Sequence, residues 1–122
     1  MNLAEIVKAV DGEILVGAVF NFDVETACAS DLMSDVLLFT KPNMLLMTGL
    51  TNPQAIRTAD MAEAPVVVFV RSKYPPPETL RLADEMGIAV VLSPYTMFEA
   101  AGILYAAGLQ GLGKLPTMRV GS

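Results

Sequence analysis

The chain has 122 residues, a length that supports a single domain with one core. Hydrophobic residues make up 53% of it and the formal net charge is −5, with the few basic residues scattered along the chain. This distribution excludes binding to a nucleic-acid backbone, which requires a clustered positive face. The high apolar content favours a second copy that covers part of the surface.

A helix is predicted at the start of the chain. Asn2 followed by Glu5 has the spacing of a capping box, and apolar residues at 3, 6, 7 and 10 share one helical face. Asp11 and Gly12 then end the helix. A short strand is expected at 13–16, followed by a turn-rich bridge over 17–23. Residues 1–25 are therefore predicted to form an edge or lid element packed on the main sheet.

The rest of the chain repeats one unit four times: a short apolar strand, a polar turn and a helix. Strands linked through helices run parallel, because a parallel return needs a long crossover. Their apolar residues do not alternate with polar ones, which indicates strands covered on both faces. The predicted strands are Thr26–Ala29, Met44–Thr48, Val66–Val70 and Ile88–Leu92.

The predicted fold class is α/β. We expect a layered α/β/α domain with a four-stranded, mostly parallel sheet, plus the N-terminal helix and short strand. Residues 26–108 would form its core and 109–122 a tail. Helices are predicted from Pro53 to about Glu63, from Pro77 to Met86 with Gly87 as a left-handed cap, and from Thr96 to about Gly108.

The last predicted helix differs from the others in composition. Its only charged residue is Glu99, and several alanines and glycines leave its cross-section small. Two interpretations remain open. The helix is either simply buried against the sheet, or it also packs on the same helix of a second copy.

The polar turns form the main candidate site. A parallel sheet brings the carboxyl ends of its strands to one edge, where ligands bind in open α/β sheets. Free N–H groups at helix N-termini favour an anion there. Arg71 and Lys73 would contact a phosphate and Tyr95 would stack on a base. The candidate ligand-binding residues are Ser30, Thr48, Asn52, Arg71, Ser72, Lys73, Ser93, Tyr95 and Thr96.

A plainer explanation of these turns stays open, since Ser, Thr and Asn are favoured at helix N-caps whatever the function. Neither a dinucleotide-binding fingerprint nor a P-loop is present. The chain contains no histidine, which removes the commonest general base and metal ligand. No catalytic residue, cofactor or metal is therefore expected.

Cys28 and the pair Asp31 and Asp35 are two smaller candidates, and each has a simpler explanation. Cys28, the single cysteine, is favoured as an inert buried thiol over one activated by a helix dipole. Asp31 and Asp35 share a helix face, where they could hold a cation. They are favoured instead as a capping or first-turn residue and a solvated one. An enzyme that uses Cys28 or Asp31 is the least favoured interpretation.

Cellular location follows from what the chain lacks. It has no apolar run near the roughly 20 residues that span a bilayer. Its first residues, Met1–Glu5, lack the basic and apolar regions of a signal peptide. A single cysteine cannot form an internal disulfide, which suits a reducing compartment. We therefore expect a cytoplasmic protein with no membrane contact.

From about residue 26 to 108 the chain resembles the DRTGG domain in its small free-standing form. The matching stretches are residues 29–36 (ASDLMSDV), the strand at 66–70 leading to Pro76-Pro77-Glu78-Thr79, and residues 87–101. That family is similar to the N-terminal domain of HPr kinase/phosphorylase, an α/β layered fold without catalytic activity of its own. The family's Thr-Gly-Gly appears here as Arg71-Ser72-Lys73.

The resemblance implies a regulatory role. DRTGG domains occur beside phosphotransacetylase domains and between paired CBS modules in regulated pyrophosphatases, as dimer-forming units associated with adenine-nucleotide control. The favoured hypothesis is a non-enzymatic regulatory domain that binds a small anionic ligand, above all an adenine nucleotide, as a homodimer. The alternative is a pure protein–protein interaction module that docks a partner enzyme and has no small-molecule ligand.

Overall fold

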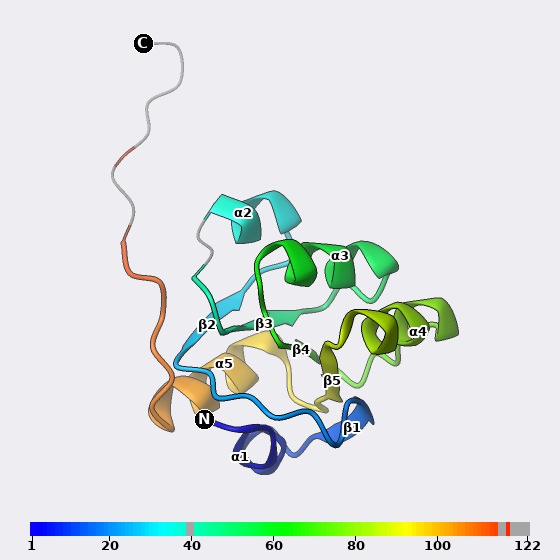
Figure 1. The fold of residues 1–122 in the computed structure, drawn as a ribbon. Coiled ribbons are helices and arrows are strands. Elements are labelled where there is room, and N and C mark those ends of the chain that lie inside the picture. Colours follow the sequence, from blue (N-terminus) through cyan, green and yellow to red (C-terminus); the bar gives the residue numbers. More distant parts are fainter. Residues whose placement is uncertain (39–40, 115–116, 118–122) are drawn as a thin grey trace.

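The structure, a computed structural model, describes residues 1–38, 41–114 and 117. It is built around a five-stranded sheet with helices on both faces (Figure 1). In chain order its elements are α1 (Leu3–Ala9), β1 (Glu13–Val16), β2 (Thr26–Ala29), α2 (Met33–Leu38), β3 (Met44–Thr48), α3 (Pro53–Met61), β4 (Val66–Phe69), α4 (Pro77–Met86), β5 (Ala89–Leu92) and α5 (Met97–Ala106).

The strands lie in the order β1-β5-β4-β3-β2. From β2 to β5 each strand is parallel to its neighbour, as the repeated strand–turn–helix unit predicted. The predicted count of four sheet strands was too low. β1 joins the sheet as a fifth strand, antiparallel to β5, because the turn after α1 brings it back along that strand's free edge.

Helices α2, α3 and α4 cover one face of the sheet, whereas α1 and α5 cover the other (Figure 1). The three crossovers between β2 and β5 all step in the same direction. Right-handed crossovers that step in one direction place their helices on one face. The strands consequently contribute to two apolar clusters, with Leu45 and Met47 facing α1 and α5, and Leu46 and Phe69 facing α2 to α4.

Several element ends differ by one or two residues from the predicted ones. Ile88 lies outside β5 because its N–H donates to Ala83 O and so closes the end of α4. Gly87 adopts the predicted left-handed conformation, with φ of 71°. Glu63 has a positive φ of 57°, so α3 ends earlier than predicted. At the other end, α5 stops at Ala106.

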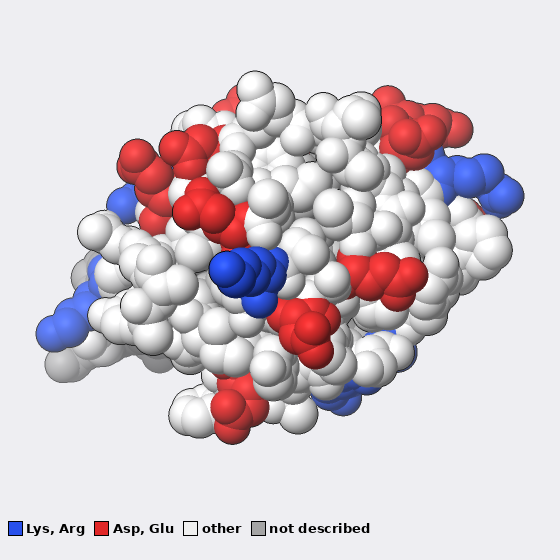
Figure 2. Space-filling view, turned by 90° about the horizontal axis from the view of Figure 1, so that it is seen from below, with Lys and Arg blue, Asp and Glu red and all other residues white. Residues whose placement is uncertain are grey.

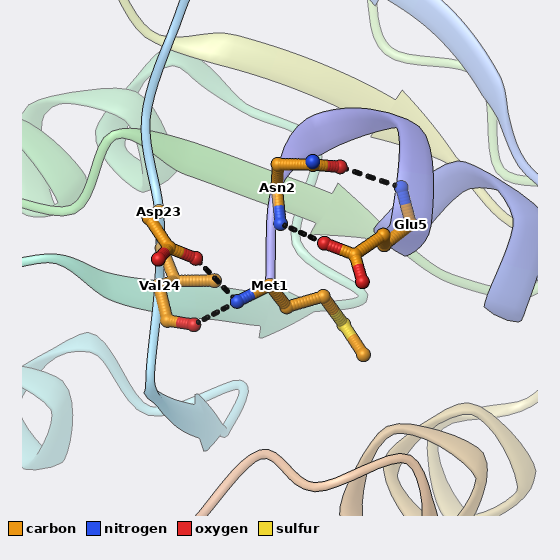
Figure 3. Close-up of polar contacts among 5 residues, drawn as sticks. All are labelled: Met1, Asn2, Glu5, Asp23 and Val24. Atoms are coloured by element: carbon orange, nitrogen blue, oxygen red, sulfur yellow. Dashed lines mark hydrogen bonds and ion pairs between the residues drawn. The ribbon is translucent and has the colours of Figure 1, made fainter.

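Residues at the N-terminus are fastened by two sets of polar contacts (Figure 3). The predicted capping box is present: Asn2 Oδ1 accepts from Glu5 N at 2.9 Å, and Glu5 Oε1 accepts from Asn2 N at 3.0 Å. The Met1 amine donates to the Asp23 carboxylate and to Val24 O. These contacts hold α1 against the segment that enters β2.

Thr58 offers a test of the packing between α3 and the sheet. Its hydroxyl is buried and has no hydrogen-bond partner among the described residues. Burying an unpaired hydroxyl costs stability, so Thr58→Val should raise the free energy of unfolding by about 1 kcal/mol. Thermal unfolding would register this as a melting temperature a few degrees higher.

Thr79 supplies the matched control for this prediction. It is equally buried, but its hydroxyl donates to Thr51 O at 2.7 Å. Thr79→Val should therefore lower the melting temperature, since it leaves the partly buried Thr51 carbonyl without its donor. A lower melting temperature for Thr58→Val would contradict the assignment of its hydroxyl as unpaired.

Candidate functional site

The predicted binding residues follow the carboxyl ends of the parallel strands, which we call the rim. Ser30 follows β2, Thr48 ends β3, and Asn52 precedes α3. Residues 71–73 follow β4, and residues 93–96 join β5 to α5. Because β2 to β5 are parallel, all these turns lie along one edge of the sheet.

One position on the rim is topologically distinct. The chain leaves β4 toward α4 on one face of the sheet, and it leaves the neighbouring β5 toward α5 on the other (Figure 1). Such a switch point is where open α/β sheets form their ligand crevices. It lies between Arg71-Ser72-Lys73 and Ser93–Thr96. Between β2 and β4 the connections all leave to one face, so no second switch point occurs there.

At the switch point the two turns are bonded to each other. Arg71 N donates to Tyr95 O at 2.8 Å and Ser72 N donates to Ser93 O at 2.9 Å. Arg71 and Ser72 both adopt the left-handed conformation, with φ of 64° and 54°, which is strained for residues that carry a Cβ. These N–H groups are thus occupied, and a bound anion would depend on the exposed side chains of Arg71, Ser72 and Lys73.

Two predicted residues use their hydroxyls inside the protein. Ser93 is fully buried, and its Oγ donates to Val10 O at 2.8 Å and accepts from Tyr95 N at 3.2 Å. Thr48 is also fully buried, and its Oγ1 donates to Asp31 at 3.0 Å. The contacts of these two hydroxyls fix the turns after β5 and β3.

Asp31 is a rim residue that sequence reasoning assigned to another role. Its Oδ1 accepts from Thr48 Oγ1 and from Gly49 N at 2.7 Å, so it connects the ends of β2 and β3 instead of capping α2. A Cβ added at Gly49 would lie 2.8 Å from Nη2 of Arg71 and 3.4 Å from both Asp31 carboxylate oxygens. Arg71 therefore reaches from β4 across the end of β3. No spacing in the sequence predicted that the Arg71 side chain lies beside Gly49.

Helix N-termini at the rim differ in the N–H donors that they can offer. Neither Asn52 nor Thr96 caps its helix through the side chain, so these two side chains do not occupy first-turn N–H groups. Proline occupies the first turn of both α3 and α4 and has no N–H. The cationic side chains at Arg71 and Lys73 are therefore the stronger attraction for an anion.

Cys28 lines a surface hollow of about 270 Å³ at the β2 end of the rim. The hollow is bounded by residues 27–30, by Asp35 of α2 and by Leu112 and Gly113 of the tail. Burial raises the pKa of the Cys28 thiol, and the nearby Asp35 carboxylate raises it further. The thiol is thus not activated by the adjacent helix. Among the described residues no group of three potential ligands for a metal ion occurs.

Charges on the α1 face of the molecule are mixed. Figure 2 shows acidic and basic residues interspersed on a mostly uncharged surface, without a basic patch on that face. This arrangement agrees with the scattered basic residues of the sequence. No helix in the described ranges combines the length and apolar character that crossing a bilayer requires.

The chain resembles known proteins in its fold. No family model matches the chain, and no curated protein does. Among solved structures, the CBS and DRTGG domains of the regulatory region of Clostridium perfringens pyrophosphatase, complexed with the activator diadenosine tetraphosphate, match with a TM-score of 0.68. The chain has the fold found in that DRTGG-containing region. The match is consistent with a DRTGG domain, so the predicted resemblance is confirmed at the level of the fold.

The structural likeness covers most of this chain but only part of the pyrophosphatase region. The alignment covers 84% of this chain at 15% sequence identity, and 45% of the pyrophosphatase regulatory chain. This chain thus spans less than half of that regulatory region. At this identity the likeness shows the fold.

Proposed function

We propose that this chain is a non-enzymatic regulatory domain that binds a small anionic ligand, above all an adenine nucleotide, at the rim. The observation that carries the proposal is the switch point between β4 and β5, where the turn after β4 carries two exposed cations: Lys73, and Arg71, whose side chain extends over the end of β3. A regulatory region of similar fold is complexed with diadenosine tetraphosphate, which adds support.

The anion would be held by side chains. Arg71 provides a fork of donors that matches phosphate geometry, and Lys73 provides a mobile point charge two residues away. Tyr95 is 37% exposed and lies in the neighbouring turn after β5. Ligand binding regulates only if it favours one state of the protein over another. Ordering of the two bonded turns at the switch point is the change that we propose.

We further propose that the domain acts as a homodimer. Helix α5 carries apolar residues on its solvent side, with Phe98 85% and Tyr105 73% exposed. Gly102 lies between them, and an added Cβ there would meet no atom within 4 Å. A helix with an apolar outer face is normally covered by a partner.

The same surface supports the alternative function. An interaction module would use Phe98 and Tyr105 to dock a partner enzyme, and its rim residues would only cap and fasten turns. The two functions differ in one measurable respect, which is the response of the domain to nucleotides.

Thermal unfolding with ligand separates these two functions. ATP, ADP, AMP and diadenosine tetraphosphate would be added separately, with inorganic triphosphate as a probe that lacks a base. A ligand at about 100 times its dissociation constant adds roughly 2.7 kcal/mol, which raises the melting temperature by several degrees. An unchanged melting temperature with every nucleotide at millimolar concentration would reject the binding proposal. A monomeric mass by light scattering would reject the dimer.

A further inference from the structure

The outer edge of strand β2 is paired only in part among the described residues. Ser30 N donates to Met47 O, so even-numbered residues of β2 direct their backbone groups toward β3. Residues 27 and 29 therefore direct theirs away from the sheet, because the direction alternates along a strand. Ala27 N confirms this direction, since it donates outward to Gln110 O at 2.9 Å.

The tail pairs with this edge at one residue only. Gln110 forms a single parallel bridge with Thr26, and its N–H donates to Glu25 O at 2.9 Å. If the ladder continued, Leu112 would bond Ala27 O and Ala29 N. No such bond forms. Instead, Leu112 and Gly113 form the far wall of the hollow of about 270 Å³.

The hollow therefore has a defined hydrogen-bonding wall. Ala27 C=O and Ala29 N–H point into it side by side, an acceptor beside a donor, and no described residue pairs with either. Its volume is near the lower end for small-molecule sites, about 300 Å³, which suits one ring system better than a whole nucleotide. Leu112 adds an apolar wall on which a ring can pack.

We propose that this hollow holds the adenine base of the nucleotide, with Ala27 C=O accepting from its 6-amino group and Ala29 N–H donating to its N1. The inference rests on the proposed function and locates the base at β2, away from Tyr95. Adenine presents a donor beside an acceptor on that edge, the complement of an acceptor beside a donor. Asp35, which also lines the hollow, supplies an additional acceptor.

The position of the hollow matches the proposed phosphate site. A base bonded to the outer edge of β2 takes the place of a further strand, three spacings from β4, which is roughly 15 Å. Arg71 extends from β4 across Gly49 toward Asp31, so its guanidinium shortens that gap. A base at β2 thus leaves its phosphates near Arg71 and Lys73. The ribose would lie beside Asp31, whose carboxylate accepts hydrogen bonds from hydroxyl groups.

The experiment compares ligands that differ only at the base edge. Binding of ATP, 7-deaza-ATP and N6,N6-dimethyl-ATP to the unaltered protein would be measured by calorimetry. The dimethyl compound lacks the 6-amino hydrogens, so we expect it to bind about tenfold more weakly or worse than ATP. The 7-deaza compound keeps the N1 and 6-amino groups and should bind as ATP does.

Two variants locate the base on the protein. Ala29→Pro removes the N–H donor at an edge strand, where proline is tolerated. It should weaken ATP binding about tenfold and leave the binding of inorganic triphosphate unchanged. Tyr95→Leu keeps the backbone contacts of Tyr95 and should bind ATP normally. Cys28 gives an independent readout: ATP should slow its reaction with a thiol reagent, whereas inorganic triphosphate should not.

Each outcome distinguishes this inference from the proposed function. If ATP binds but the dimethyl compound binds equally well, or if Tyr95→Leu loses affinity while Ala29→Pro keeps it, the base lies elsewhere and only this inference fails. If no adenine nucleotide binds the unaltered protein, the proposed function fails and this inference fails with it.

Discussion

Replacing both Arg71 and Lys73 with alanine should abolish the stabilisation that ATP gives this domain. At about 100 times the dissociation constant the unaltered protein gains roughly 2.7 kcal/mol, and the double variant should gain almost none. The two side chains are the exposed cations at the switch point. Without ligand, the melting temperature of the double variant should stay nearly unchanged, because alanine keeps the Cβ at the left-handed position of Arg71.

A second double variant controls for charge. Lys41 lies just before β3, at the opposite end of the sheet, and Arg81 lies in α4; both are exposed. Lys41→Ala with Arg81→Ala changes the net charge by the same amount but leaves the rim intact. It should respond to ATP as the unaltered protein does. An equal loss in both double variants would mean that overall charge, rather than a site, governs the response.

Ser93→Ala should destabilise the domain by about 1–3 kcal/mol, because the Val10 carbonyl loses the donor that Ser93 provides. The same change removes the acceptor of Tyr95 N and so loosens the turn after β5. Thermal unfolding would show a melting temperature lower by several degrees.

Ser34→Ala is the comparison for Ser93→Ala, because Ser34 is exposed and its side chain forms no hydrogen bond with any residue that the structure describes. Its melting temperature should stay within the small range expected for surface substitutions. If Ser93→Ala unfolded at the temperature of the unaltered protein, the Val10 contact would not contribute to stability.

Much of the sheet could be predicted because each of its parallel strands is marked by a local sequence pattern. Val66–Phe69 is an unbroken apolar run followed by a turn, and such runs indicate strands covered on both faces. The pairing of β1 could not be predicted, since it depends on where the turn after α1 directs the chain. Strand order and the faces that the helices cover are likewise products of packing.

The candidate site was predictable only in part. Polar turns at the carboxyl ends of parallel strands follow from connectivity, and the structure places Arg71 and Tyr95 on neighbouring turns as a result. The burial of Ser93 depends on α1, which is distant in sequence. The hollow beside β2 depends on the tail leaving the edge after Gln110, and no local pattern marks such a departure.

The switch point and the hollow beside β2 both lie next to contacts that we expect to form late in folding. The pairings among β2, β3, β4 and β5 join segments that are consecutive along the chain, so they close short loops and can form early. The Ser93 contact with Val10 joins residues 83 positions apart, and the Gln110 bridge to Thr26 is similarly distant. We expect both of these long-range contacts, which we call seams, to form late in folding, after the central strands have paired. A ligand bound beside either seam would therefore secure the parts of the domain that open first.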